Sequence, residues 1–102
     1  MTVATKTLPP VPEFEDGKVA NDVTIICNSP IESIELLSPP DVDYYGRPNG
    51  SEGKIEVDEN SPRKWKKGER PRIRITAASP TFKMRRGQWT VDGVPRGEPF
   101  DL

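Results

Sequence analysis

The sequence predicts an all-β fold, either a sandwich or a small open barrel. Three observations support this prediction. Apolar and polar residues alternate over short runs of about four to seven residues, as in half-buried strands. Turns containing glycine and proline separate these runs, and no helical pattern of about ten residues or more occurs. The chain has 102 residues, the size of one domain, so we expect one small core.

Residues 23–27, 54–58 and 72–78 show the clearest strand patterns, because apolar and β-branched side chains alternate with polar ones. Two shorter strands are expected at 81–84 and 88–91. In each of these segments one face is apolar and the other is wet, which is typical of sheets that cover a core on one side.

Residues 29–37 are compatible with a short helix or with a strand. Ser29 and Glu32 form a capping box, and Pro30 would occupy the first helical position. Against a helix, apolar residues alternate within the segment, and a Pro-Pro pair after it leaves room for barely two turns. We favour a strand.

Residues 38–53 are predicted to form one long loop, because they contain several prolines and glycines and no apolar alternation. Asn49-Gly50 indicates a tight turn at its end, and Asp92-Gly93 indicates another after the last strand. Loops of this length are usually functional or held by a partner.

The predicted domain occupies residues 21–94 and carries an extension at each end. Residues 1–20 show no hydrophobic periodicity, and their prolines favour an extended, solvated path, so this segment is expected to be an arm. Residues 95–102 are expected to form a loose C-terminal tail. The prolines that define the N-terminal arm are Pro9, Pro10 and Pro12.

Across residues 20–94 the strand rhythm resembles that of immunoglobulin-like sandwich modules. The runs that carry the resemblance are Val-Thr-Ile-Ile-Cys, Ser-Pro-Ile-Glu-Ser-Ile-Glu-Leu, Lys-Ile-Glu-Val and Lys-Lys-Gly-Glu-Arg-Pro-Arg-Ile-Arg-Ile-Thr-Ala. The resemblance implies a small immunoglobulin-like sandwich with extended N- and C-terminal arms, of the kind found in viral decoration or cement proteins. Such modules mostly bind or brace other proteins.

The residue types that support most enzyme chemistry are missing from the sequence. There is no histidine, and Cys27 is the one cysteine, so histidine-activated nucleophiles and structural zinc sites are excluded. Cys27 ends a strand at an inward position and is expected to pack in the core. We predict no enzymatic activity, no cofactor and no bound metal.

Several acidic residues stand close together in the sequence, and we interpret them mainly as solvated charges. Two groups offer calcium or acid-pair chemistry, and a calcium- or carbohydrate-binding module around Tyr44 and Tyr45 is a minor alternative. These groups are Asp41 with Asp43, and Glu56 with Asp58 and Glu59.

The segment 63–74 holds seven basic residues in twelve positions, with Trp65 among them. Its second half, from Arg72, is the wet face of a predicted strand, so only the first half is an unexplained basic turn. Trp65 is predicted to be either an exposed anchor or a lid over one end of the sandwich. Trp89, in contrast, shares a strand face with Val91 and is expected in the core.

Charge is divided along the sequence. Residues 1–60 contain twelve acidic and four basic residues, a net charge of −8, and residues 61–102 contain eleven basic and four acidic residues, +7. If the fold interleaves the two halves, they neutralise each other, for instance with Glu56 opposite Arg72 or Arg74. If the halves stay apart, opposite faces could bind an acidic partner or another copy of the chain.

We therefore expect a non-enzymatic structural or accessory subunit that binds and stabilises a larger protein assembly, for example a virion decoration or cement protein. The N-terminus lacks the apolar segment of a secretion signal, and no apolar run approaches the ~18 residues of a membrane span, so a cytoplasmic or virion location is expected. The expected partner-binding residues are Arg63, Lys64, Trp65, Lys66, Lys67, Arg70, Tyr44, Tyr45, Pro9, Pro10 and Pro12.

The alternative is a nucleic-acid or ribonucleoprotein accessory that binds through the basic segments 63–74 and 83–86. The acidic first half and the sequence pI of about 5.5 weigh against it, because both oppose attraction to phosphate.

Overall fold

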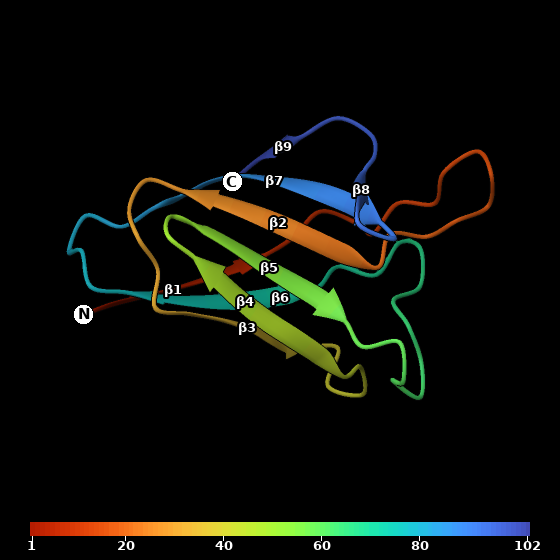
Figure 1. Ribbon diagram of the computed structural model, residues 1–102, viewed down its shortest axis with the longest axis horizontal. Coiled ribbons are helices and arrows are strands. Elements are labelled where there is room, and N and C mark those ends of the chain that lie inside the picture. The colour runs from red at the N-terminus through yellow and green to blue at the C-terminus, as the bar shows by residue number, and fades with distance from the viewer.

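The computed structural model describes residues 1–102 and shows two antiparallel sheets packed as a sandwich, with no helix (Figure 1). One sheet has three strands in the order β1-β6-β3, and the other has six in the order β4-β5-β2-β7-β8, with β9 also paired to β7. The strands are β1 Thr2–Thr7, β2 Asp22–Cys27, β3 Ser33–Ser38, β4 Tyr44–Asn49, β5 Glu52–Val57, β6 Arg72–Ala77, β7 Met84–Val91, β8 Val94–Pro95 and β9 Phe100–Asp101. The predicted all-β class is confirmed. The structure has no helix that is long and apolar enough to cross a membrane.

The core lies between the sheets and is built from the inward faces of β2, β5 and β6. Its central side chains are completely buried, which stabilises the fold by about 1.5–3 kcal/mol for each of them. They are Val23, Ile25, Ile55, Ile73 and Ile75. The strands predicted at 23–27, 54–58 and 72–78 are therefore confirmed, and residues 33–38 form the strand that was favoured over a helix.

The strand order differs from that of an immunoglobulin constant-type domain in one respect. Numbered along the chain, that domain has sheets 1-2-5-4 and 3-6-7. Here the first seven strands form 7-2-5-4 and 3-6-1, so β1 and β7 have exchanged places. β1 therefore takes the edge position beside β6 that the seventh strand occupies in the immunoglobulin domain.

The prediction of an N-terminal arm outside the domain is wrong. β1 pairs with β6 along its whole length, from Thr2 opposite Ala77 to Thr7 opposite Arg72. The segment escaped prediction because half of β1 is threonine and most of it is exposed, so its pairing depends on the main chain and leaves little apolar pattern. After it, Leu8 is fully buried and belongs to the core.

The C-terminal tail also lies on the sandwich. β8 and β9 both pair with β7, and Phe100 packs against Trp89 with 5.5 Å between ring centroids. Gly87 permits this, because a side-chain carbon at its position would overlap the Phe100 ring. The expected loose tail is therefore a docked segment that covers one edge of the larger sheet.

The long loop predicted at 38–53 is partly wrong, because β4 and the start of β5 lie within it. The predicted turn at Asn49-Gly50 joins these two strands. β4 gave no strand pattern because most of it is exposed and it contains Gly46 and Pro48, which are tolerated on an edge strand.

The two short strands predicted at 81–84 and 88–91 are one strand, β7. A bulge in its pairing with β2 shifts the register at Arg85, so that Arg85 and Arg86 are both exposed between buried residues. The bulge interrupts the alternation, which is why the strand was predicted as two pieces. The Asp92-Gly93 turn follows as expected, with both residues at positive φ, 50° and 81°.

Candidate functional site

Most of the residues predicted to bind a partner come together at one end of the sandwich, at the right in Figure 1. We call this the loop end; it comprises residues 8–21, 39–44, 58–71 and 92–93. Residues 8–12, the proline segment, lie along residues 63–71, which we call the basic loop. The main-chain amide of Val11 donates to the carbonyl of Glu69, and the amide of Gly68 donates to the carbonyl of Val11, both at 2.8 Å. These two segments, far apart in the sequence, therefore hold one another, and the prolines do not form a free arm although Pro10 is exposed.

Trp65 is a lid, the second of the two roles considered for it. Its exposed fraction is 3 %, and it packs edge-on against Trp89 with a centroid separation of 5.7 Å. In this conformation it is not available to an outside partner. The basic residues around it surround a core side chain.

Several of the surrounding cations have partners within the chain. The guanidinium of Arg63 forms two-point contacts with Asp41, at 2.6 and 2.8 Å, and with Glu69, at 3.0 and 2.8 Å. Arg63 lowers the pKa of both carboxyl groups below the usual value. The ammonium of Lys64 donates to two main-chain carbonyls, and Lys67 forms an ion pair with a carboxylate at 3.5 Å.

Lys66 and Arg70 are the remaining cations of the basic loop, and both are exposed. Lys66 forms no ion pair, and Arg70 donates to the main-chain carbonyl of Leu8 at 3.0 Å. The basic loop therefore has a structural role, and much of its positive charge is neutralised within the chain.

Tyr44 and Tyr45 point to opposite sides of β4. Tyr44 is half-buried against the core, whereas Tyr45 is exposed on the outer face of the six-stranded sheet. The guanidinium of Arg47 stacks over the Tyr45 ring at 5.0 Å and forms an ion pair with Glu56 at 3.0 Å. Only Tyr45 is presented to a ligand.

The two oppositely charged halves of the sequence interleave in the fold. Five of the seven ion pairs join a residue from 1–60 to one from 61–102. The pairing expected between Glu56 and Arg72 or Arg74 does not form, because β5 and β6 lie in different sheets. The five pairs that join the halves are Lys18–Asp92, Arg63–Asp41, Lys67–Glu13, Arg74–Glu35 and Arg96–Asp16.

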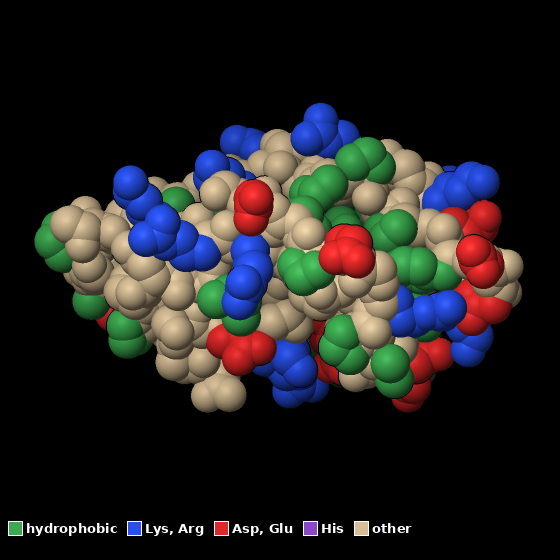
Figure 2. All heavy atoms as spheres, turned by 90° about the horizontal axis from the view of Figure 1, so that it is seen from above, with side chains coloured by type: hydrophobic (Ala, Val, Ile, Leu, Met, Phe, Trp, Pro, Cys, Tyr) green, Lys and Arg blue, Asp and Glu red, His purple; other side chains and the backbone are tan.

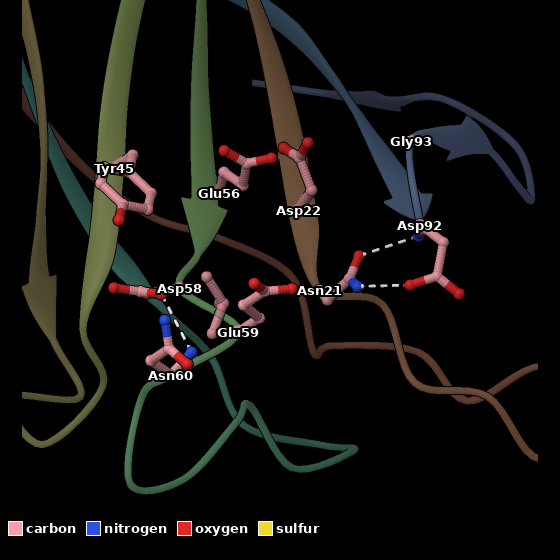
Figure 3. A pocket seen from close by; sticks show the side chains of 10 residues that line it. Asn21, Asp22, Tyr45, Glu56, Asp58, Glu59, Asn60, Asp92 and Gly93 are labelled. Atoms are coloured by element: carbon pink, nitrogen blue, oxygen red, sulfur yellow. Dashed lines mark hydrogen bonds between the residues drawn. The ribbon is translucent and has the colours of Figure 1, made fainter.

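A pocket of about 330 Å³ opens at the loop end of the six-stranded sheet (Figure 3). We call it the acidic pocket, because five carboxylates and no basic residue line it. Its remaining polar groups include Tyr45 and the amides of Asn21 and Asn60. The five carboxylates are those of Asp22, Glu56, Asp58, Glu59 and Asp92.

Hydrogen bonds between the lining residues fix the walls of the acidic pocket. Asn21 and Asp92 bind each other reciprocally, because the Asn21 amide donates to the Asp92 carboxylate at 3.0 Å and the Asp92 main chain donates back at 3.1 Å. On the other side, the main-chain amide of Asn60 donates to the Asp58 carboxylate at 2.9 Å. Asp58 in turn raises the pKa of Tyr45 by its negative charge.

Asp22 is the one carboxylate of the acidic pocket that is buried, with an exposed fraction of 7 %. It lies on the outer face of β2 between Glu56 of β5 and Thr90 of β7, its register partners. Figure 3 shows the side chains of Asp22 and Glu56 pointing toward one another. One oxygen of Asp22, Oδ1, has no hydrogen-bond partner, and burial raises the pKa of the group.

Sequence reasoning found part of this pocket. It grouped Glu56, Asp58 and Glu59 as acids and singled out Tyr45, but it missed Asp22 and Asp92. The available signal for Asp22 was alternation, because Val23 and Ile25 point inward and place Asp22 on the outer face. Nothing in the sequence indicated that this outer position is buried.

Two further observations bear on chemistry. No group of three or more Asp, Glu, Cys or His side chains in the structure is arranged to hold one metal ion. Cys27 is in the core as predicted, and burial raises its pKa to about 11, so its thiol stays protonated at neutral pH.

One sheet edge is left open. The edges of β3 and β4 pack against each other, and β8 and β9 cover β7, whereas β1 contacts no strand other than β6. The Leu8 amide donates to the Pro71 carbonyl at 2.8 Å, so the main-chain groups of Leu8 point toward β6. In an antiparallel pair the direction alternates along the strand, and the N–H and C=O groups of the residues at odd-numbered positions in β1 therefore point to the open side. These residues are Val3, Thr5 and Thr7, all exposed.

The fold and these surfaces define an all-β sandwich protein with an open edge strand and an acidic pocket. Comparison of the chain with protein-family models, curated proteins and solved structures found no match. Function is therefore argued from the surfaces themselves.

Proposed function

We propose that this chain is a non-enzymatic structural or accessory subunit that binds and stabilises a larger protein assembly. The observation that carries the proposal is the open edge of β1. Its N–H and C=O groups at Val3, Thr5 and Thr7 are free to pair with an extended segment of another subunit. A virion decoration or cement protein would be one case of such a subunit.

Natural sandwiches normally protect their edge strands, because an open edge pairs with other chains. The other edges of this sandwich are covered, but β1 carries a single charged residue, Lys6, and neither proline nor a bulge. An edge of six residues with one lysine as its sole protection supports pairing with a partner strand.

The protein itself offers a variant that blocks the edge and preserves the fold. The N–H of Thr5 points to the open side, so Thr5→Pro removes a donor from the edge without removing a bond to β6. Thr5→Val is the matched control, because it keeps the N–H and the β-branched shape.

Both variants and the natural chain would be expressed in the cells that produce the protein, and the complexes in the cell extracts would be separated by size. We expect the natural chain and Thr5→Val in a large assembly, with the amides of Val3, Thr5 and Thr7 protected from hydrogen exchange there but not in the isolated chain. Thr5→Pro should remain monomeric. Equal incorporation of Thr5→Pro, or a natural chain found only as a monomer, would contradict the proposal.

One observation favours a nucleic-acid accessory as a second candidate. Lys83, Arg85 and Arg86 are exposed and form no ion pair, and Figure 2 shows basic side chains gathered toward the end where β7 begins. However, the basic loop lies at the opposite end of the sandwich (Figure 1), so the two predicted segments do not form one surface.

A binding titration with single-stranded oligonucleotides tests this candidate. Phosphate contacts would make affinity fall steeply with salt, and Arg85→Ala with Arg86→Ala would abolish binding, whereas Lys66→Ala at the loop end would not. No binding at about 50 mM salt would exclude it.

A further inference from the structure

The acidic pocket has unbalanced negative charge. Glu56 is paired with Arg47 and Asp92 with Lys18 at 3.4 Å, but the carboxylates of Asp22, Asp58 and Glu59 form no ion pair. Lys64 reaches this region only through main-chain carbonyls of residues 58 and 59, and Lys54 acts on Asp22 through its positive charge without forming an ion pair. The pocket therefore attracts a cation.

Asp22 provides a second, independent indication of a ligand. A buried polar atom without a partner costs free energy, so natural structures rarely leave one unsatisfied. Oδ1 of Asp22 is such an atom, and Asp22 lines the pocket. The neighbouring Thr90 hydroxyl is also buried and makes no hydrogen bond, and the Glu56 carboxylate can only accept hydrogen bonds. A donor that enters the pocket would supply the missing bond.

The spacing of the acids selects the kind of cation. They are not grouped closely enough for three of them to hold one metal ion, and the pocket, at about 330 Å³, is larger than a single ion requires. A guanidinium group is planar and carries five donors in a rigid fork, so it can contact separated acceptors at the same time. Tyr45, at the rim, already accepts a guanidinium over its ring, that of Arg47.

We propose that the acidic pocket binds a guanidinium group, with Asp22 as the buried acceptor and Asp58 and Glu59 as the outer acceptors. This site lies on the six-stranded sheet and does not depend on the open edge of β1. The guanidinium belongs either to an arginine of a protein segment or to a free small molecule, and the two sources have the same chemistry at the pocket.

The test is a titration of the full-length, ¹⁵N-labelled protein followed by NMR. The probes are a blocked Gly-Arg-Gly peptide, agmatine, and a blocked Gly-citrulline-Gly peptide, in which a neutral urea replaces the guanidinium. We expect saturable shifts of the Asn21 and Asn60 side-chain amides and of the Gly93 main chain, with a dissociation constant on the order of 1 mM. The citrulline peptide should bind at least about tenfold more weakly.

Variants establish which residues bind. Asp22→Asn and Glu59→Gln should each weaken binding by about tenfold or more, because each removes a charged acceptor. Asp101→Asn is the matched control, since it makes the same change of charge at β9, outside the pocket. Thermal unfolding of each variant shows separately that it is folded.

The outcomes separate the possibilities. Tighter binding of the Gly-Arg-Gly peptide assigns a protein segment as the source, and tighter binding of agmatine assigns a small molecule; both support a guanidinium site. Equal binding of the citrulline peptide, no saturable shift up to about 20 mM probe, or unchanged affinity in Asp22→Asn would overturn the proposal. A stronger saturable response to CaCl₂ at the same residues would overturn it in favour of a divalent cation.

Discussion

Trp65 closes the loop end of the core by packing edge-on against Trp89, and this contact explains why a tryptophan stands within a basic loop. A buried aromatic pair of this kind contributes beyond the area it removes from water. We predict that Trp65→Ala lowers the free energy of unfolding by about 3–5 kcal/mol, measured by urea denaturation. Lys66→Ala, its exposed neighbour, should change it by less than about 0.5 kcal/mol. Similar small effects of both variants would show that Trp65 is not a core residue.

Asp22 should make stability depend on pH in an unusual direction. Burial raises its pKa in the folded state, so the folded chain holds this proton over a pH range in which the unfolded chain has lost it. Stability from this group is therefore present below its unfolded pKa, about 3.9, and is lost as pH rises through the folded pKa. Asp22→Asn, which cannot ionise, avoids this loss.

We predict that Asp22→Asn and the natural chain have similar thermal stability near pH 3, and that the variant becomes the more stable of the two by pH 7. Other acids, such as Glu35 and Asp41, have a pKa lowered by arginines and change stability with pH in the opposite direction. They act equally in both proteins, so the difference in thermal stability between the two reports on Asp22 alone. A difference that does not change with pH would mean that Asp22 titrates normally in the folded chain.

At the scale of the elements, the join between the two sheets depends on a close approach of β3 and β4. Gly46 of β4 lies against the main chain of β3, and an added methyl group would overlap the carbonyl oxygen of Ile34. The approach covers an edge of each sheet, so a single glycine protects two edges from pairing with other chains.

We predict that Gly46→Ala lowers the free energy of unfolding by about 1–3 kcal/mol, because the two strands must move apart. Chemical denaturation measures this, with Ser51→Ala in the adjoining turn as a control of small effect. If β4 could separate from β3 without cost, both variants would unfold at the same denaturant concentration.

Contacts at the loop end connect segments that are far apart in the sequence. Arg63 joins two acids from separate segments, and main-chain bonds connect the proline segment to residues 67–71. Ion pairs of Arg63 and Lys67 neutralise part of the charge that first indicated a binding surface. The pocket beside them keeps part of its negative charge, because the carboxylates of Asp22, Asp58 and Glu59 form no ion pair.

At the scale of the whole molecule, the N-terminal segment is part of the folded unit. Leu8 is fully buried and Val11 nearly so, and β1 occupies the edge beside β6. Deletion of residues 1–12 is therefore expected to lower the free energy of unfolding by at least about 3 kcal/mol, or to prevent folding, since two buried apolar side chains contribute about 1.5–3 kcal/mol each.

Circular dichroism of the chain that lacks residues 1–12, together with limited trypsin digestion of the intact chain, tests this prediction. Lys6→Ala serves as the control, because this side chain is exposed. A deleted chain with the urea midpoint of the full chain, or rapid cleavage after Lys6 in the native protein, would show that the segment is an appendage.

The all-β class, the three central strands and their inward faces could be predicted from the sequence, because alternation of apolar residues leaves little freedom in which face is buried. The sequence also indicated turns at Asn49-Gly50 and Asp92-Gly93, where Gly50, Asp92 and Gly93 adopt positive φ values. It could not determine β1 or β4, whose exposed residues carry no alternation and whose positions depend on main-chain pairing.

The role of the charged residues, in contrast, depends on contacts between segments that the folded chain brings together. The sequence showed seven basic residues in the segment 63–74, but whether each meets solvent or a carboxylate depends on distant segments, as in the ion pair of Lys67 with Glu13. The same holds for Asp22, an outward residue that becomes buried because Glu56 and Thr90 flank it on neighbouring strands. Alternation fixes the face of a strand locally, whereas burial and ion pairing are set by contacts that exist only once the sheets have formed.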